Sequence, residues 1–202
     1  MPMIKTPPPR IPMVETVLDE WRDIQAPPPP ATQSVIINPA KTALILMDFL
    51  REICTPQHRP RAAAVMPKLQ GFLREARARG MVVVHTTTPT TSGADLADAV
   101  KPIAGEPVYG GKVDKFHGCD LESFLRGRGI DTVVATGTSA NGCLLFTTAG
   151  AALRGFKVIV PVDGMPAATA YQEQFVAWQI ANGPVIRDMA VLTRFDAISF
   201  QK

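Results

Sequence analysis

The sequence predicts an α/β domain in which helices cover both faces of a doubly wound, parallel sheet. Short apolar runs alternate along the chain with longer amphipathic segments, which is the pattern of successive βαβ units. The runs at 42–47, 81–84, 132–135 and 157–160 are continuously apolar after their first residue, without the alternation of polar residues that a half-exposed strand shows. This indicates strands that are buried on both faces. Right-handed crossovers between parallel strands then place helices on both sides of the sheet.

The chain is expected to divide into an arm, residues 1–34, and a domain, residues 35–202. Proline runs at 7–9 and 27–30 are stiff and extended, and they cannot enter the interior of a sheet. Between them lies a short amphipathic piece, residues 14–24, that contains Trp21. We expect this arm to lie over the domain or over a neighbouring subunit; the alternative is a loose tail.

Within the domain, periodicity and end signals place the elements. A helix over 62–79 has an apolar stripe and ends at Gly80, although Pro67 requires a kink or a later start. Asp120 is the expected N-cap of a helix over 121–128. A short helix is expected at 94–100, and a longer one at 168–181 with Tyr171, Phe175 and Trp178 on one stripe. A weaker strand is expected at 107–109 and a last strand at 185–192.

Composition excludes several classes of protein. The chain is 46% hydrophobic and 19% charged, and its net charge of +3 is too small to argue for nucleic-acid binding. No apolar run is long enough to cross a membrane, and the N-terminus has no secretory signal. Three cysteines without a C-x-x-C pair indicate free thiols and a cytoplasmic protein, with no membrane partner.

Cys143 is the strongest candidate for chemistry. It follows a buried strand and a turn of small residues, 137–142, and it opens an apolar run that Gly155 ends. A helix start carries partial positive charge and unpaired N–H groups, which favour a thiolate nucleophile. The alternative is a small buried side chain that only packs under the sheet.

Three other candidates also follow strands. Asp48 ends the first apolar run, His85 ends the second, and Lys112 follows two glycines after the third. The carboxyl ends of parallel strands meet at one edge of a sheet, where ligands bind, so Asp48, Lys112 and Cys143 form an acid/base, cation and nucleophile set. Lys115 is a rival for the cation.

The chain resembles the isochorismatase-like cysteine hydrolases over roughly residues 41–200. The matching segments are Leu-Ile-Leu-Met-Asp at 44–48, Phe-His-Gly-Cys-Asp-Leu at 116–121 and Thr-Gly-Thr-Ser-Ala-Asn-Gly-Cys at 136–143. The resemblance implies a three-layer α/β/α fold with a six-stranded, mainly parallel sheet. Because the family is commonly oligomeric, a homo-oligomer, a dimer or tetramer, is expected. The arm lies outside the matching residues, and we expect it at or near the interface because of its proline runs and Trp21.

The resemblance further implies roles for individual residues. Cys143 attacks a carbonyl carbon of a small amide or carbamoyl compound to form a thioester, Asp48 moves the proton, and Lys112 holds both in place. The backbone N–H groups of Ser139 and Cys143 form the oxyanion hole, and a cis peptide joins Thr138 to Ser139.

The sequence departs from the family pattern at several positions, and these departures bear on the metal site and on the function. His58 lacks the Asp-x-His partner of the metal site found in nicotinamidases, so no metal and no cofactor are expected. Two alternatives are open: a vinyl-ether hydrolase that uses Asp48 without the thiol, and an inactive relative that serves as a binding or scaffold protein. The residues expected near the pocket are Phe49, Leu50, His85, Lys115 and Asn141.

Overall fold

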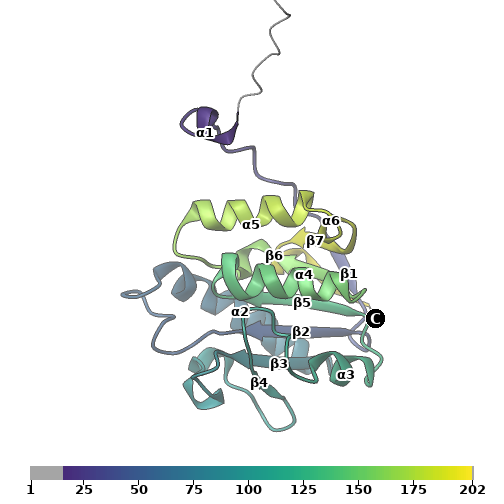
Figure 1. Ribbon diagram of the computed structural model, residues 1–202. Coiled ribbons are helices and arrows are strands. Elements are labelled where there is room, and N and C mark those ends of the chain that lie inside the picture. The colour runs from purple at the N-terminus through teal and green to yellow at the C-terminus, as the bar shows by residue number, and fades with distance from the viewer. Residues whose placement is uncertain (1–15, 202) are drawn as a thin grey trace, which may run out of the picture.

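The computed structural model describes residues 16–201 and contains a six-stranded sheet in the order β4-β3-β2-β5-β6-β7, with every pair parallel (Figure 1). This confirms the predicted fold class. The strands are β2 (Thr42–Met47), β3 (Val82–Thr87), β4 (Val108–Gly110), β5 (Thr132–Gly137), β6 (Lys157–Pro161) and β7 (Ala190–Thr193).

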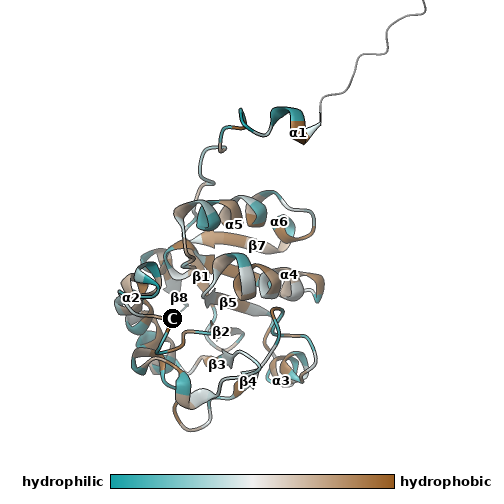
Figure 2. Cartoon of the chain, turned by 60° about the vertical axis from the view of Figure 1, so that its left-hand side comes forward, coloured by the Kyte–Doolittle hydropathy of each residue, from teal (hydrophilic) through white to brown (hydrophobic). Residues whose placement is uncertain are grey.

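Helices cover both faces of this sheet. Successive side chains of a strand point to opposite faces, and because both sets are apolar here, each face needs a covering layer. On β2, Ala43, Ile45 and Met47 belong to the core under α3 (Leu121–Arg126), α4 (Leu145–Leu153) and α5 (Ala170–Asn182). Leu44 and Leu46 belong to the opposite core, under α2 (Pro60–Ala78). Figure 2 shows the apolar strands enclosed between these layers.

The central strands end together, and this sets the place of the site. Met47, the last residue of β2, is paired with Thr86 of β3 and with Gly137 of β5. A Cβ atom on Gly137 would lie 2.6 Å from the Cβ atom of Met47, so only glycine allows this approach. The segments after β2, β3 and β5 therefore leave the sheet side by side.

Three expected elements differ from the structure. Residues 185–192 are not one strand, because α6 (Ile186–Met189) precedes β7 and Val185 adopts a positive φ of 68° that breaks the extended backbone. Residues 94–100 form two separate 3₁₀ turns, Gly93–Asp95 and Asp98–Val100. Pro67 lies inside α2 without ending it.

A small second sheet was not expected from the sequence. It pairs β1 (Val35–Ile37) with β8 (Ile198–Phe200), in parallel. Each strand has only three residues, and Ile36 is exposed, so neither has a readable pattern of burial. Ile37 and Ile198 nevertheless join the core on the α2 side of the main sheet.

The described part of the arm lies outside the domain. It contains one helical turn, α1 (Val17–Glu20), and stands off from the sheet in Figure 1. The Pro27 carbonyl accepts a hydrogen bond of 2.7 Å from Gln174 on α5. The predicted proline run at 7–9 and the start of the amphipathic piece at Val14 lie outside the described residues.

The aromatic stripe of α5 faces outward. Tyr171, Phe175 and Trp178 share one side of the helix, as their spacing predicts, but all three are exposed. The residues that bury α5 against the sheet lie on its other side, and they are Val176, Ala177 and Ile180.

Candidate active site

Asp48 directly follows β2, at the edge where the central strands end. Its φ is +57°, in the left-handed region, which few residues other than glycine, asparagine and aspartate adopt without strain. The side chain is nearly buried, and its Oδ1 accepts a hydrogen bond of 3.0 Å from the Thr86 hydroxyl. The backbone N–H of Asp48 also donates to the Thr86 carbonyl oxygen, at 3.2 Å. The carboxylate is thus fixed in place by β3.

Lys115 is the cation of the site. Its Nζ lies 2.8 Å from Asp48 Oδ2, and only 2% of the side chain is exposed. The same Nζ donates to the carbonyl oxygens of Thr87 at 3.2 Å and Gly111 at 3.5 Å. Its backbone N–H donates to the Thr147 hydroxyl at 3.1 Å, which ties the lysine to α4. The buried ammonium therefore has a full set of acceptors.

The prediction of Lys112 as this cation is wrong, and the rival Lys115 takes its place. Lys112 is exposed, whereas the turn after β4 folds back and brings Lys115 under the sheet edge. A Cβ atom on Gly111 would lie 3.3 Å from Cδ of Lys115. Gly111 therefore leaves room for the stem of the later lysine.

Cys143 lies in a π-helical turn, Ala140–Leu144, that precedes α4. The expected α-helix thus begins only at Leu145. Cys143 is 6% exposed, and its Sγ lies 3.8 Å from the Ser139 carbonyl oxygen. Burial, and then the nearby Asp48 carboxylate, raise the pKa of the Cys143 thiol, while Lys115 lowers it by less. Burial thus opposes the effect expected of a helix start, and it favours the protonated thiol, which needs a base to become a nucleophile.

The turn before Cys143 has the backbone geometry that the resemblance implied. The peptide between Thr138 and Ser139 is cis. The Thr138 N–H donates to the Met47 carbonyl at 3.0 Å, which holds this turn beside the end of β2. Over residues 16–201, the Ser139 N–H has no hydrogen-bond acceptor, so it is free to bind a ligand oxygen.

Of the residues expected around a pocket, Asn141 is exposed, whereas Phe49 and Leu50 are buried. Asn141 is exposed at the turn, and its side-chain oxygen accepts a hydrogen bond from the Ser139 hydroxyl. Phe49 and Leu50 are almost completely buried; Phe49 packs into the core under α2. Leu50 forms an antiparallel bridge with Leu96.

His85 is wrong as a pocket residue. Strand β3 extends two residues beyond it, so the ring points into the interior and is fully buried. Its Nε2 lies 2.8 Å from Glu106 Oε2, and the Glu106 carboxylate in turn accepts two hydrogen bonds of 2.8 Å from Arg77. This charged cluster braces β3 against the segment before β4.

Thr86, Thr147 and Arg59 contact the site residues and were not found by sequence reasoning. Arg59 donates from a terminal guanidinium nitrogen to the Thr138 hydroxyl at 3.1 Å. The threonines carried a weak signal, because hydroxyl side chains at the end of an apolar strand have no reason to be buried unless they bond to another buried group. Arg59 carried none, since a lone arginine in a loop is ordinarily solvated.

The described part of the structure has neither a cluster of metal-ligand side chains nor a membrane-spanning helix. Over residues 16–201, no three His, Cys, Asp or Glu side chains gather as they would around a metal ion. No helix in the same range is both long and apolar enough to cross a bilayer.

Comparison with known proteins gives a consistent result. Residues 42–190 match the isochorismatase domain family. N-carbamoylsarcosine amidase of Arthrobacter sp is 28% identical over 191 residues, covering 78% of this chain and 72% of the relative. Maleamate amidohydrolase of Pseudomonas putida is 30% identical over 148 residues, covering 59% of this chain and 70% of the relative.

Solved structures agree with this. The crystal structure of N-carbamoylsarcosine amidase from Thermoplasma acidophilum superposes with a TM-score of 0.66 at 26% identity, over 77% of this chain and 97% of the other. An isochorismatase family protein from Desulfovibrio vulgaris shares the fold, with a TM-score of 0.69 at 22% identity, over 78% and 95%. Since the family match spans well over half of the sequence, the predicted resemblance is confirmed, and the chain belongs to the isochorismatase domain family.

Proposed function

We propose that this protein is a cysteine-dependent hydrolase that cleaves a C–N bond of a small amide or carbamoyl compound through a thioester. Its family and its two curated relatives make it a hydrolase of C–N bonds other than peptide bonds. The observation that supports the cysteine mechanism is the buried Cys143 thiol beside the Asp48–Lys115 ion pair. A neutral thiol next to a fixed carboxylate is the pair that nucleophilic attack requires.

In the first half-reaction, Asp48 takes the thiol proton as Sγ of Cys143 bonds to the carbonyl carbon. The carbonyl π electrons move to oxygen, and the backbone N–H groups of Ser139 and Cys143 donate to that oxyanion. The tetrahedral intermediate then collapses, the C–N bond breaks, and the departing nitrogen takes the proton from Asp48. The products are a free amine or ammonia and the thioester.

In the second half-reaction, Asp48 is again a carboxylate and takes a proton from water. The hydroxide adds to the thioester carbon, the C–S bond breaks, and the thiolate of Cys143 recovers the proton from Asp48. The Lys115 side chain stabilises the negative charge that passes between Asp48 and Cys143.

Ammonia release from small amides, ureas and carbamoyl acids tests this proposal. We expect turnover in the parent protein, none above background in Cys143→Ala, and an acyl adduct on the Cys143 peptide by mass spectrometry. Cys54→Ser and Cys119→Ser are the matched controls and keep activity. If Cys143→Ala remained fully active on these compounds, the thiol would have no role and the thioester mechanism would be refuted. Turnover of a vinyl ether that survives Cys143→Ala, in a protein inactive on amides, would instead favour the vinyl-ether hydrolase that relies on Asp48. A protein inactive on every such compound would favour the binding or scaffold alternative.

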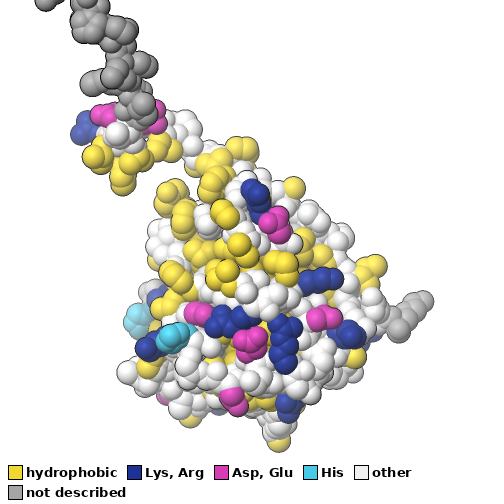
Figure 3. All heavy atoms as spheres, turned by 45° about the vertical axis from the view of Figure 1, so that its right-hand side comes forward, with side chains coloured by type: hydrophobic (Ala, Val, Ile, Leu, Met, Phe, Trp, Pro, Cys, Tyr) yellow, Lys and Arg dark blue, Asp and Glu magenta, His cyan; other side chains and the backbone are white. Residues whose placement is uncertain are grey.

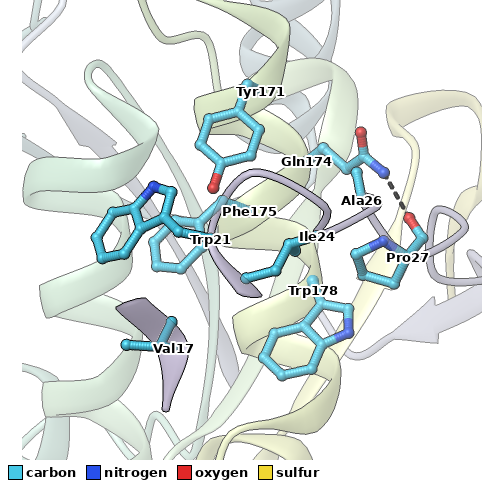
Figure 4. Close-up of a pocket in the computed structure, with 9 residues that line it drawn as sticks. All are labelled: Val17, Trp21, Ile24, Ala26, Pro27, Tyr171, Gln174, Phe175 and Trp178. Atoms are coloured by element: carbon cyan, nitrogen blue, oxygen red, sulfur yellow. Dashed lines mark hydrogen bonds between the residues drawn. The ribbon is translucent and has the colours of Figure 1, made fainter. Parts of the chain in front are cut away.

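We also propose that the protein is a homo-oligomer with the arm at its interface. Apolar side chains from the arm and from α5 are exposed together around a hollow of about 590 Å³, and Trp21 is 66% exposed. Figure 3 shows apolar side chains gathered on the part of the domain next to the arm, and Figure 4 shows the rings around the hollow. Monomers seldom leave so many large apolar residues in contact with water. The lining side chains from the arm and α5 include Val17, Trp21, Ile24, Tyr171, Phe175 and Trp178.

A second copy of this chain is the occupant we propose for this surface, because the arm of one copy could pack on α5 of the other while its own α5 receives the second arm. The proline run at 27–30 is stiff and keeps the arm from packing down onto α5, so the apolar side chains on both sides of the hollow stay open to a second copy. Light scattering after gel filtration tests this: the parent is expected to be a dimer or tetramer, and Trp21→Ser with Trp178→Ser a monomer. Leu153→Ser, on an exposed apolar residue of α4 outside this surface, is the control. A monomeric parent would refute the proposal.

A further inference from the structure

Arg59 has an unusual environment for an arginine. It is half-buried in the loop between β2 and α2, and within residues 16–201 no carboxylate oxygen lies within the 4.0 Å of an ion pair. Arg61, two positions later, pairs with Glu173 through two guanidinium nitrogens. A partly desolvated guanidinium without a counter-ion retains a net positive charge that a bound anion would neutralise.

The guanidinium of Arg59 is connected to the candidate active site. Its only side-chain hydrogen bond in the described chain goes to the Thr138 hydroxyl, at 3.1 Å. Thr138 immediately precedes Ser139, whose free N–H belongs to the proposed oxyanion hole and whose carbonyl lies 3.8 Å from Cys143 Sγ. The positive charge is therefore next to the turn that would hold the reacting carbonyl.

The backbone holds Arg59 in position. Its N–H donates to the Thr55 carbonyl at 2.9 Å, and its own carbonyl accepts from Ala63 in the first turn of α2 at 3.0 Å. One of the five guanidinium N–H donors is used by Thr138, which leaves a fork of donors for another group. Two parallel N–H donors match the two oxygens of a carboxylate.

The other charged residues at this edge are not available to bind a carboxylate. The Asp48 carboxylate is already neutralised by Lys115, and Lys115 is enclosed by carbonyl oxygens. Among the charged residues described above at this edge of the sheet, Arg59 is therefore the one whose charge has no partner. We propose that Arg59 binds a carboxylate of the substrate, so that the preferred substrates are short amides or carbamoyl compounds that carry a carboxylate beside the scissile group. This inference rests on the proposed hydrolase function.

Activity on a matched pair of compounds tests the inference. Succinamic acid and its methyl ester have the same amide and differ in the negative charge. We expect the parent to prefer the acid, and Arg59→Ala to lose about 30- to 1,000-fold in kcat/KM on the acid while changing little on the ester. Arg59→Lys should fall between, because it keeps the charge and loses the fork. Arg61→Ala is the control and should keep the parent's preference.

Two further measurements separate binding from a structural role and from the reaction itself. Thr138→Val removes the hydrogen bond but keeps the guanidinium, so it should retain the preference for the acid; a loss equal to that of Arg59→Ala would make Arg59 only a support for the turn. Calorimetric titration of succinate into the parent and Arg59→Ala needs no turnover. Equal affinities, or equal losses of Arg59→Ala on acid and ester, would overturn the inference while the hydrolase proposal stood. Succinate binding that needs Arg59, in a protein inactive on all amides, would refute the hydrolase instead.

Discussion

The Lys115 ammonium lies 2.8 Å from the Asp48 carboxylate, although 67 positions of sequence separate the two residues. Both groups are almost inaccessible to water, and each has a further partner: Thr86 for the carboxylate and two carbonyl oxygens for the ammonium. A buried ion pair of this kind is costly to break from one side, because the remaining charge has no water to solvate it.

Lys115→Ala should therefore inactivate and destabilise the protein. The variant leaves Asp48 charged and unpaired in a dry site, which costs about 3–5 kcal/mol of the free energy of unfolding. Urea unfolding followed by fluorescence measures that loss, and ammonia release measures activity. Lys112→Ala, three residues earlier and exposed, should match the parent in both. Equal effects of the two substitutions would show that Lys115 is not the partner of Asp48 in solution.

Thr86→Val should destabilise the protein, because it removes the hydroxyl that donates to Asp48. A hydrogen bond to a charged group contributes about 1.5–3 kcal/mol. Thr148 supplies an opposite control: its hydroxyl is buried and has no partner in the described chain, so Thr148→Val should stabilise by about 1 kcal/mol. Thermal unfolding of both variants is the measurement, and shifts of the same sign would contradict the assignment of partners.

Alkylation of Cys143 should be slow at neutral pH and speed up as pH rises, because burial and Asp48 raise the pKa of its thiol. Asp48→Asn removes the negative charge and leaves Lys115, so the pKa of the thiol falls and alkylation at pH 7 accelerates while turnover is lost. Asparagine suits the positive φ of this position as aspartate does. Iodoacetamide labelling with mass spectrometry, in a Cys54→Ser, Cys119→Ser background, follows the rate. Slower labelling of Asp48→Asn would mean that the carboxylate does not suppress the thiolate.

The free energy of unfolding should decrease as pH falls below about 6.5. Burial lowers the pKa of His85 from its ordinary 6.5, against the opposing effect of Glu106. In that range the unfolded chain binds a proton at this ring that the folded chain does not bind, so acid favours unfolding. Urea titrations at pH 7 and pH 5.5 measure the decrease. His85→Gln should show a smaller decrease; an identical one would assign the effect to other groups.

Gly137→Ala should damage both folding and activity, because its Cβ would lie 2.6 Å from Cβ of Met47 and 3.0 Å from the carbonyl oxygen of Met47. Strand β5 would have to move, and the turn that carries Ser139 and Cys143 would move with it. Gly71→Ala is the control: the new methyl group meets nothing within 4 Å in α2. It should stabilise by about 0.5–1 kcal/mol, since alanine is the better helix former. Calorimetry and turnover of the two variants give the comparison.

Much of this fold could be predicted because burial on both faces leaves a clear pattern. β2 and β5 are continuous apolar runs, and the polar residue that ends each run marks the edge where the site forms. β1 and β8 could not be predicted, because strands of three residues with one exposed side have no period to read. The α5 stripe could be found, but sequence spacing does not say whether such a stripe faces a core or another surface.

The candidate site was predicted less completely, because some of its features depend on tertiary packing and leave no pattern in the sequence. Asp48 and Cys143 follow strands, so topology brings them to one edge. Lys115 lies on a loop, and the direction in which a loop returns depends on contacts such as the one with Thr147. Burial, which raises the pKa of Cys143, is likewise a property of the packed structure, and a helix terminus read from sequence predicted the opposite shift.

The far edge of the sheet has a practical consequence. The Gln201 N–H donates to the Ile37 carbonyl at 2.9 Å, and Gln201 borders the same surface hollow as Lys41 and Asp131, where β2 and β5 begin. Six residues of β2 separate that edge from Asp48, about 20 Å of extended chain. A tether fused beyond Gln201 would therefore fasten the molecule to a sensor chip or bead with its reactive edge turned toward the flowing solution, an orientation suited to immobilised assays.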